Sequence, residues 1–341
     1  MNILAVETSC DETSASVLDN DIVLSNIISS QISHNKFGGV VPELASREHL
    51  KNISAIVSKS LDSSSKQLKD IDVIAATCEP GLIGSLLIGM NFAKSLAFTL
   101  NVPFIPVNHI QAHLYSNFLN GQKPEFPFIG LIVSGGHTLL IHVEDFFRHK
   151  IIGYTLDDAA GEAFDKTAKL LGLGYPGGHH IDRLAKAGDR NYHKFPLTIV
   201  KESKYNFSFS GIKTSVLYYL RKINFENVKT DSLISDIAAS FQEAVTDSLL
   251  YNTLEASKAY GVKIISVSGG VSANSRLQEK FEKLTASGYK VYFPKSEYAS
   301  DNAAMIGLTG YLKYIHTKDK SEFNLQSLNY LAKPRLDYDN F

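Results

Sequence analysis

Two stretches of the chain decide its fold: ILAVETSCDET at residues 3–13 and IGLIVSGGHT at residues 129–138. Each begins with a short apolar run, turns through small and polar residues, and continues from a threonine into a second β-rich run. Short apolar runs bounded by turn residues are typical of buried strands. Because the pattern occurs in both halves, it favours an internal duplication over a coincidence of two common hairpin patterns.

Beyond these two hairpins, helical and strand patterns alternate along the chain. Helical spacing of apolar residues occurs at residues 44–61, 85–100, 234–249, 275–284 and 302–316. Strand-like runs occur at residues 22–28, 73–77, 104–107, 264–267 and 291–293. This order predicts an α/β protein in which each half has a mixed sheet with helices on its faces. Two prolines among polar neighbours at residues 123–127 indicate the junction between the halves.

The composition is that of an ordinary folded chain. With 341 residues, two domains of roughly 150 residues each are expected. Hydrophobic residues make up 44% and charged residues 20%, which excludes a disordered or fibrous protein. Two cysteines, Cys10 and Cys78, exclude a disulfide framework and a four-cysteine metal site, and they indicate a reducing compartment.

Targeting signals and charge indicate the cellular compartment and the kind of nucleic-acid surface to expect. No basic region precedes the apolar run at residues 3–6, and no run approaches the roughly 18 uncharged apolar residues of a membrane span. We therefore expect a cytoplasmic protein without a membrane segment. Because 34 Lys and Arg residues balance 35 Asp and Glu residues, a nucleic-acid surface must be a local patch.

Three turns rich in small residues follow apolar strands, at residues 8–12, 134–138 and 268–274. Glycine allows backbone N–H groups to approach a phosphate closely, so the three turns together favour a nucleotide site, although each one alone is also explained as a tight turn. The glycine spacings of P-loop and dinucleotide-binding motifs do not occur, which excludes those two classes.

His109 and His113 are four residues apart, which places both imidazoles on one face of a helix, where they can chelate a metal or simply pack in the core. A zincin peptidase is excluded because Ile110 occupies the position of its catalytic glutamate. Asp301 is a candidate third ligand. From the pattern alone, however, a helix N-cap explains Asp301 better.

Several carboxylates are candidates for chemistry. Asp11 and Glu12 are adjacent in the first turn, and Asp165 interrupts an apolar, small-residue helical pattern where a carboxylate needs a partner. A glycine-rich turn at residues 174–178 precedes the helix that carries Asp182. Loop carboxylates are also often merely solvated.

Residues 183–222 concentrate positive charge, with nine Lys or Arg residues against Asp189 and Glu202. Aromatic residues are interleaved among them. This combination suits phosphate contacts with base stacking on RNA, and it equally suits a solvated basic face over core aromatics.

The ordered motifs of the chain resemble one family nearly from end to end. They are ETSCDET at 7–13, VPELASR at 41–47, PGLIGSL at 80–86, NHIQAH at 108–113, VSGGHT at 133–138, NFSFSGIKT at 206–214, GGVSAN at 269–274 and DNAA at 301–304. The chain resembles the bacterial form of the tRNA N(6)-adenosine threonylcarbamoyltransferases, formerly labelled glycoproteases, in the actin-like, sugar-kinase-like ATPase fold. It departs from the usual family pattern at Glu79, His179 and residues 299–300.

The resemblance implies two lobes with duplicated mixed sheets around a central cleft. The N-terminal lobe is expected at residues 1–107, completed by about residues 315–341, and the C-terminal lobe at residues 108–314, with both the metal and the nucleotide sites. One divalent metal per subunit, favoured as Fe²⁺ with Zn²⁺ as the alternative, is implied on His109, His113 and Asp301. This implication replaces the N-cap interpretation of Asp301.

The resemblance also implies the substrate-binding residues. These are Ile132, Val133, Ser134, Gly135, Gly136, Asp165, Gly178, Asp182 and Asn274, with the adenine nucleotide beside Gly269 and Gly270. Asp11 and Glu12 are candidates for a catalytic acid–base or ordering role. Lys201, Lys204 and Lys213 are candidates for tRNA binding.

The implied reaction transfers threonylcarbamoyl from threonylcarbamoyl-adenylate to the N6 amine of adenosine 37, beside the anticodon of tRNAs that read ANN codons, and releases AMP. The implied partners are tRNA, a paralogous subunit of the same fold and a small ATPase. A small-molecule carbamoyltransferase or a kinase of the same fold is the alternative, because fold alone does not select a function. A non-catalytic scaffold is a weaker alternative, because scaffold paralogues lack the paired histidines.

Overall fold

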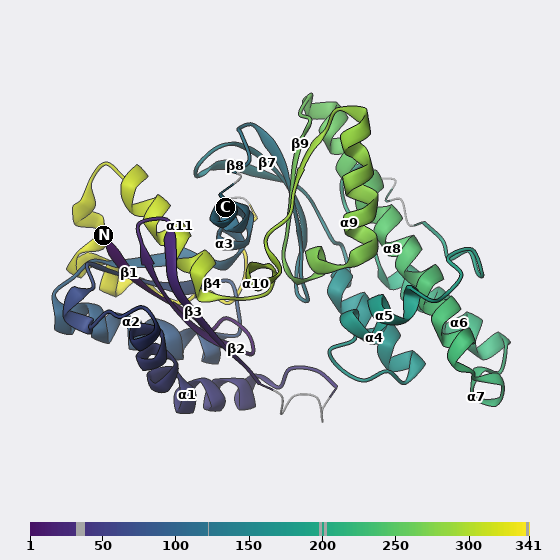
Figure 1. The fold of residues 1–341 in the computed structure, drawn as a ribbon, viewed down its shortest axis with the longest axis horizontal. Coiled ribbons are helices and arrows are strands. Elements are labelled where there is room, and N and C mark those ends of the chain that lie inside the picture. Colours follow the sequence, from purple (N-terminus) through teal and green to yellow (C-terminus); the bar gives the residue numbers. More distant parts are fainter. Residues whose placement is uncertain (32–37, 122, 198–199, 201–202, 339–340) are drawn as a thin grey trace. The chain divides into compact units, whose positions relative to one another are not determined.

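The chain folds as two α/β units, each built around its own five-stranded sheet (Figure 1). The computed structural model describes residues 1–31, 38–121, 123–197, 200, 203–338 and 341. Unit 1 comprises Met1–Lys123 and Pro294–Phe341, and unit 2 comprises Pro124–Phe293. The chain passes from one unit to the other within the proline-containing segment that the sequence indicated.

The sheet of unit 1 has the order β3-β2-β1-β4-β5. Its strands are β1 (Asn2–Glu7), β2 (Glu12–Asp19), β3 (Ile22–Ser30), β4 (Val73–Glu79) and β5 (Phe104–Asn108). The first three strands are antiparallel, whereas β4 and β5 run parallel to β1. Alternate residues of β1 face opposite sides: Leu4 packs with the core beneath α1 and α2, and Ala5 lies against Gly307 of α11.

Helices cover both faces of this sheet. They are α1 (Pro42–Ser63), α2 (Ile83–Leu100), α3 (His109–Tyr115), α10 (Ser296–Ala299) and α11 (Ala303–His316). Short 3₁₀ turns are η2 (Leu68–Asp70), η3 (Ser116–Asn120), η6 (Lys320–Phe323) and η7 (Leu325–Asn329). Helices α1 and α2 pack together on one face, and α11 packs on β1 and β2 and contacts α3.

The sheet of unit 2 has the order β10-β9-β6-β7-β8. Its strands are β6 (Phe128–Val133), β7 (Thr138–Asp145), β8 (Arg148–Tyr154), β9 (Ile264–Ser268) and β10 (Lys290–Tyr292). Its helices are α4 (Ala160–Leu171), α5 (Gly178–Ala185), α6 (Ser210–Lys222), α7 (Phe225–Val228), α8 (Asp231–Tyr260) and α9 (Ser275–Glu282), with 3₁₀ turns η4 (Gly270–Ala273) and η5 (Lys283–Ser287). The long helix α8 packs on β6, β7, α5, α6 and α9.

The two sheets have the same topology, which confirms the predicted duplication. Read from β1 or β6, each sheet has an antiparallel hairpin and a third antiparallel strand on one side, and two parallel strands on the other. The two hairpins that opened the sequence analysis are the central β1–β2 and β6–β7 pairs. The α/β architecture expected from the strand and helix order is therefore present in both units.

The division of the chain differs from the expected boundaries at residues 107 and 314. Residues 108–123 and 294–314 lie in unit 1. The physical reason is direct: α3 continues from β5 without a linker, and α11 buries its apolar side on β1 and β2. As a result, the expected metal ligands and the expected nucleotide residues lie in different units, whereas we expected both in the C-terminal lobe.

One described helix, α2, is long and apolar enough to cross a membrane by length and composition. It is not a fully uncharged run of the kind that the sequence analysis considered, because it contains Lys94. Core helices of soluble proteins pass the same test, and Leu86, Met90 and Ala93 of α2 are buried in unit 1.

Candidate metal centre and nucleotide-binding cluster

Helix α3 brings His109 and His113 together at the end of a core strand. Asn108 ends β5, and its Oδ1 accepts hydrogen bonds from the backbone N–H groups of Ile110 and Gln111 at 2.9 and 3.2 Å. An Asn at this position is a strong helix N-cap, so His109 becomes the first helical residue and His113 follows one turn later. The two rings meet edge to face with centroids 4.6 Å apart, and both are buried.

Asp301 joins the two histidines from the start of α11, and it is not the N-cap of that helix. The cap is the next residue, Asn302, whose buried side chain accepts a hydrogen bond from the backbone N–H of Met305 at 3.1 Å. The Oδ1 atom of Asp301 lies 3.1 Å from His113 Nε2 and 3.5 Å from His109 Nε2. The N-cap interpretation of Asp301 is therefore wrong.

The three side chains fit a metal ion in both geometry and chemistry. Ligands that bind one ion at about 2.0–2.2 Å lie about 3–3.5 Å from each other, which matches the two measured separations from Asp301. All three ligand atoms lie within 4.8 Å of one another. Two imidazoles and one carboxylate suit Zn²⁺ or non-haem Fe²⁺.

A second carboxylate, Glu7, supports this group from β1. Its Oε2 accepts a hydrogen bond from His109 Nδ1 at 3.0 Å and one from the Thr77 hydroxyl at 2.5 Å. Its Oε1 accepts the backbone N–H of Ser9. Metal-binding histidines typically donate their second N–H to a carboxylate, which orients the ring and fixes its tautomer. Glu7 therefore directs Nε2 of His109 toward Asp301.

Burial and the neighbouring charges shift the pKa values of these three groups in opposite directions. Burial alone lowers the pKa of His109, but the carboxylates of Asp301 and Glu7 outweigh it and raise the pKa to about 9. Burial also raises the pKa of Glu7, but the charge and hydrogen bond of His109 hold that pKa below its ordinary value. Burial lowers the pKa of His113, and the neighbouring Asp301 does not compensate fully.

The turn between β1 and β2 carries Asp11 and Glu12 beside this cluster. Burial, followed by the charges of Asp301 and Asp11, raises the pKa of Glu12 well above its ordinary value. His49 of α1, which the sequence analysis did not single out, binds both ends of the turn: Nε2 lies 2.9 Å from the carbonyl oxygen of Cys10 and Nδ1 lies 2.8 Å from Thr13 Oγ1. No local signal in the sequence indicated that His49 is buried or which residues it binds.

Glu79, one of the residues that differ from the usual family pattern, has a structural role beside α3. Its Oε1 accepts a hydrogen bond from the side-chain amide of Asn108, the N-cap of α3, at 3.4 Å. Its Oε2 forms an ion pair with Lys333 Nζ at 3.2 Å, and the Lys333 backbone N–H donates to the carbonyl oxygen of Cys78. Glu79 thus ties the C-terminal segment to the strand end that precedes the histidines.

In unit 2, the hairpin between β6 and β7 forms a tight turn of small residues. The backbone N–H of Ser134 donates to the carbonyl oxygen of His137, and Ser134 Oγ accepts the backbone N–H of His137. An added Cβ at Gly135 or Gly136 would meet no atom within 4 Å, so open space faces both positions. Ile132 and Val133, the preceding residues, are fully buried in β6, so only their backbone is available to a ligand.

The turn after β9 lies directly against this hairpin. Strands β6 and β9 are parallel neighbours, so their carboxyl ends share one edge of the sheet. Gly269 has a φ of +88°, and a Cβ there would lie 2.4 Å from the carbonyl oxygen of Val133. Glycine is required at this position by both conformation and close approach. Gly270 begins η4 beside it, so the predicted glycine turns of unit 2 are adjacent.

The remaining predicted residues hold the surrounding helix ends in place. Asp165 Oδ1 accepts the backbone N–H of Gly177 at 2.6 Å, and Gly178 then begins α5. Asp182 Oδ1 accepts the backbone N–H and the hydroxyl of Ser275 at 3.1 and 2.8 Å. Asn274 is the N-cap of α9.

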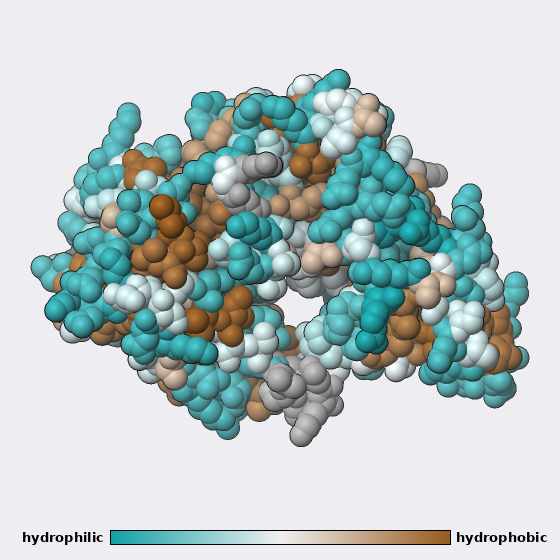
Figure 2. Space-filling model, viewed as in Figure 1, coloured by the Kyte–Doolittle hydropathy of each residue, from teal (hydrophilic) through white to brown (hydrophobic). Residues whose placement is uncertain are grey.

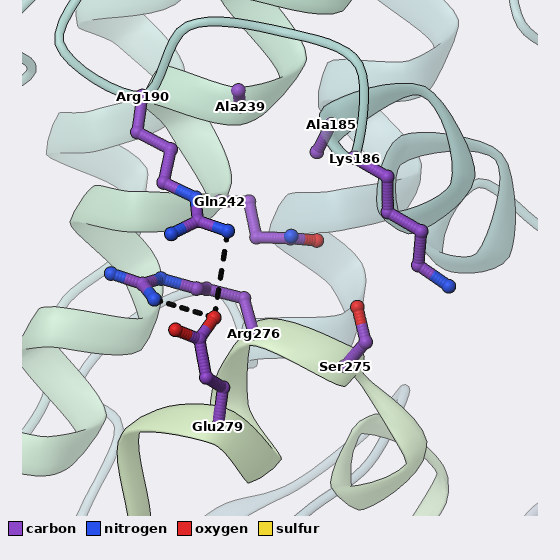
Figure 3. Close-up of a pocket in the computed structure, with 8 residues that line it drawn as sticks. All are labelled: Ala185, Lys186, Arg190, Ala239, Gln242, Ser275, Arg276 and Glu279. Carbon is purple, nitrogen blue, oxygen red and sulfur yellow. Dashed lines mark ion pairs between the residues drawn. The ribbon is translucent and has the colours of Figure 1, made fainter. Parts of the chain in front are cut away.

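A small cavity lies beside the Asp182–Ser275 contact (Figure 3). Its volume of about 30 Å³ has room for a water molecule or two and is too small for a nucleotide. Figure 3 shows Arg190 and Arg276 converging on Glu279, whose carboxylate lies 3.5 and 2.6 Å from them, and Lys186 extending away from this group.

Of the three lysines predicted to bind tRNA, the structure describes two, which have different surroundings. Lys201 lies outside the described residues. Lys204 is exposed in a turn, whereas Lys213 forms an ion pair with Asp158 at 2.9 Å. Asp158 also binds Lys166 of α4 at 2.8 Å. The pair between Lys213 and Asp158 holds the first turn of α6 on the loop before α4.

Comparison with solved structures shows which fold this chain has. Full-length HypF in its phosphate- and nucleotide-bound form aligns with 93% of this chain and 56% of its own length, with a TM-score of 0.59 and 17% identity. Component A of the (R)-2-hydroxyglutaryl-CoA dehydratase of Acidaminococcus fermentans aligns over 92% of this chain and 99% of its own, with a TM-score of 0.54 and 15% identity. The fold is that of the actin-like ATPases.

Sequence comparison defines the family within that fold. The profile of the tRNA N6-adenosine threonylcarbamoyltransferases matches residues 22–308. Relatives of that name from Chloroherpeton thalassium and Clostridioides difficile are 52% and 51% identical, covering 92% of this chain and 92% and 94% of their own. One from Caldicellulosiruptor saccharolyticus is 47% identical over 97% of this chain and 98% of its own. The chain belongs to the tRNA N6-adenosine threonylcarbamoyltransferase family.

Proposed function

We propose that this chain transfers the threonylcarbamoyl group of threonylcarbamoyl-adenylate to the N6 amine of adenosine 37 in tRNAs that read ANN codons. The observation that carries the proposal is family membership over nearly the whole chain, at 52% identity to a threonylcarbamoyltransferase. The retained pair of histidines with Asp301 and Glu7 supports it, because this chain keeps a complete ligand set rather than a degraded one.

The reaction exchanges one bond at the carbamoyl carbon. The exocyclic amine of adenosine attacks that carbon, the new N–C bond forms, and the C–O bond to the phosphate breaks, so that AMP leaves with the bonding electron pair. The amine loses one proton. Because an adenine amine is a weak nucleophile and the donor is an activated mixed anhydride, positioning contributes more than base strength.

Unit 2 is suited to hold the adenylate. The open space at Gly135 and Gly136 allows backbone N–H groups to approach the phosphate, and the turn of Gly269 and Gly270 lies beside them for the adenosine. The carboxylates of Asp165 and Asp182 are acceptors for substrate hydroxyl groups. Each already orders a helix end, through Gly177 and Ser275, so the acceptors are held rigidly.

Unit 1 is suited to hold one divalent ion through His109, His113 and Asp301, with Fe²⁺ favoured and Zn²⁺ as the alternative. A bound ion there supplies Lewis-acid polarisation of a substrate oxygen. Glu7 keeps His109 oriented, and His49 holds the turn of Asp11 and Glu12. Asp11 and Glu12 in that turn are candidates for an acid–base or ordering role.

Partners and compartment are part of the proposal. As the family resemblance implies, activity requires a paralogous subunit of the same fold and a small ATPase, and the adenylate is made by a separate enzyme. The macromolecular substrate is tRNA, so the proposed compartment is the cytoplasm.

The test is transfer of labelled threonine, supplied as fresh threonylcarbamoyl-adenylate, to an unmodified ANN-decoding tRNA transcript. The wild-type chain is assayed alone and with the partner proteins, beside His109→Ala. A transcript with guanosine at position 37, which lacks the N6 amine, is the matched acceptor control. We expect label only in the adenosine-37 transcript, and its loss in His109→Ala.

If the partnered wild-type chain leaves the adenosine-37 transcript unlabelled while donor and metal are verified, the proposal is wrong. Label in a small-molecule acceptor, or phosphate transfer from ATP, would then favour the carbamoyltransferase or kinase alternative. Equal labelling by His109→Ala would retain the reaction but exclude the proposed role of the metal-ligand cluster.

A further inference from the structure

The basic stretch at residues 183–222 is continuous in sequence, but the fold separates it along helix α8. The segment at residues 188–193 contacts the first part of α8: Gly188 lies against Ser235, and the backbone N–H of His193 donates to Ser240 Oγ. Lys204 lies next to Tyr205, whose ring is 6.4 Å from that of Tyr260 at the other end of α8. At 1.5 Å per residue, the two places are about 30 Å apart.

The segment between α5 and residue 195, which we call the α5 loop, is held firmly on α8. An added Cβ at Gly188 would lie 2.0 Å from the carbonyl oxygen of Ser235, so only glycine allows this approach. Asp236 Oδ1 accepts the backbone N–H of Asp189 at 2.7 Å, and Ser240 binds the segment at two points. The side chains of the α5 loop are therefore presented on an ordered backbone.

The acidic groups of the α5 loop are engaged locally, whereas its basic groups face solvent. Asp189 Oδ1 accepts the backbone N–H of Asn191, as Asp236 does for Asp189. Lys186, Arg190 and Lys194 are all exposed. In the part of the chain that the structure describes, Lys194 has no ion pair, and the nearest carboxylate oxygen to Lys186 is 3.8 Å away on Asp182.

Arg190 shares its carboxylate with other cations. Glu279 is 3.5 Å from Arg190, 2.6 Å from Arg276 and 2.8 Å from Lys283. Glu243 also forms an ion pair with Arg276 at 2.6 Å, and Lys280 is paired with Glu243 and Asp247. Four cations (Arg190, Arg276, Lys280 and Lys283) therefore face three carboxylates (Glu243, Asp247 and Glu279), which leaves one net positive charge. Over α8 and α9 the visible surface is mainly hydrophilic (Figure 2).

Aromatic groups and a further cation join this face from α6. The ring of His193 stacks on Tyr219 with centroids 4.0 Å apart, and Tyr192 forms a hydrogen bond with Tyr219. Lys222 lies one helical turn beyond Tyr219 and, among the described residues, has no ion pair. Tyr192 itself is 44% exposed, so a ring is available for stacking beside the charges.

The face continues directly into the candidate donor site. Lys186 is the C-cap of α5, one turn after Asp182, and Asp182 binds Ser275 at the start of α9. Lys186, Arg190 and Ser275 also line the same small cavity (Figure 3). A polyanion bound along the face therefore reaches the residues proposed to hold the adenylate.

We infer that Lys186, Arg190, Lys194 and Lys222, with Tyr192 beside them, form the surface of unit 2 that binds the phosphate backbone of the tRNA acceptor. The inference rests on the proposed function, because it takes tRNA as the polyanion. It replaces the expected set of Lys201, Lys204 and Lys213, of which Lys213 is neutralised by Asp158 and Lys204 lies at the far end of α8.

The test compares two triple variants that lose the same charge. One is Lys186→Ala with Arg190→Ala and Lys194→Ala. The control is Lys150→Ala with Lys258→Ala and Lys263→Ala, three exposed lysines of unit 2 in β8 and at or just beyond the C-terminal end of α8. Binding of the unmodified tRNA transcript is measured over a range of KCl concentrations, followed by steady-state transfer and binding of AMP.

We expect the first variant to bind tRNA about tenfold more weakly. The slope of log affinity against log salt, which is negative, should become shallower by about 2–3, because each lost phosphate contact removes about 0.7–0.9 from its magnitude. Its KM for tRNA rises, whereas kcat at saturating tRNA and AMP affinity stay at the wild-type values. The control keeps the wild-type slope, apart from the small effect of net charge.

Equal slopes in the two variants, or a larger loss from Lys204→Ala than from the first variant, would overturn the assignment of this surface. Normal tRNA binding with loss of a partner protein would assign the face to that protein and also overturn it. A wild-type chain that binds tRNA with salt dependence but labels none would refute the proposed function separately, because binding and transfer are measured in different arms.

Discussion

Glu7 and His109 form a fully buried carboxylate–imidazole pair, in which His109 Nδ1 donates to Glu7 Oε2 at 3.0 Å. The pair connects the central strand β1 to the first residue of α3, 102 residues later in the chain. Because Nδ1 is engaged, only Nε2 of His109 is available to the cluster with His113 and Asp301.

We predict that Glu7→Gln weakens metal binding about 10–100-fold, because an amide cannot orient the imidazole as the carboxylate does. Metal affinity is measured by competition with a chromogenic chelator, independently of transfer activity. Glu43→Gln makes the same chemical change at an exposed ion pair with Arg47 and should leave metal affinity unchanged. Equal affinity in Glu7→Gln and wild type would show that the pair does not support the metal.

Substitutions at the neighbouring residues Asp301 and Asn302 should affect different properties: metal binding in the first case and stability in the second. Asp301→Asn is expected to abolish tight metal binding, with little change in the free energy of unfolding of the metal-free protein. Asn302→Ala removes the N-cap of α11 and should cost about 1 kcal/mol in the free energy of unfolding. Chelator competition and urea unfolding of both variants check this. If Asn302→Ala alone lost metal, the ligand assignment would be reversed.

Gly269 and Gly270 should differ sharply in their tolerance of alanine. Gly269→Ala combines a positive φ of +88° with a contact 2.4 Å from the carbonyl oxygen of Val133, so we expect a loss of about 1–3 kcal/mol in stability. Gly270→Ala meets no atom within 4 Å and should change stability by less than about 0.5 kcal/mol. Urea unfolding distinguishes them, and similar losses would contradict the steric argument.

His149 in β8 should make unit 2 less stable at acidic pH. Burial lowers the pKa of His149 to about 4, below the ordinary unfolded value of about 6.5. Between these values the unfolded chain binds a proton that the native state does not, so stability is full above pH 6.5 and falls as the pH is lowered toward 4.

The check compares wild type with His149→Gln by urea unfolding at several pH values. The difference in the free energy of unfolding between the two proteins should shift by up to about 3 kcal/mol from pH 7.5 to pH 4. A difference that does not change with pH would show that His149 is not buried as a neutral imidazole.

Local patterns were sufficient for most of the secondary structure and for part of the site. The helical spacing at residues 85–100, the β-rich runs of both hairpins and the two histidines on one helical face are all present as predicted. Strand β8 and helix α6 were not predicted, because β8 is half-exposed and α6 lies in a stretch dominated by charge and aromatic residues. The N-cap at Asn302 was missed in favour of its neighbour, because either side chain can cap a helix.

The sequence by itself determined the α/β order, the duplication of the hairpin and the placement of His109 and His113 on one helical face, because these depend on periodicity and spacing within short segments. Asp301 was assigned as the third ligand only through the family resemblance, because its local pattern favoured a helix N-cap. Tertiary structure alone decided that Glu7 supports His109, that residues 108–123 pack with unit 1, and that the basic stretch divides along α8. These features depend on contacts between residues far apart in the chain. Such contacts arise when sheets and helices bury their apolar faces, which no local pattern encodes.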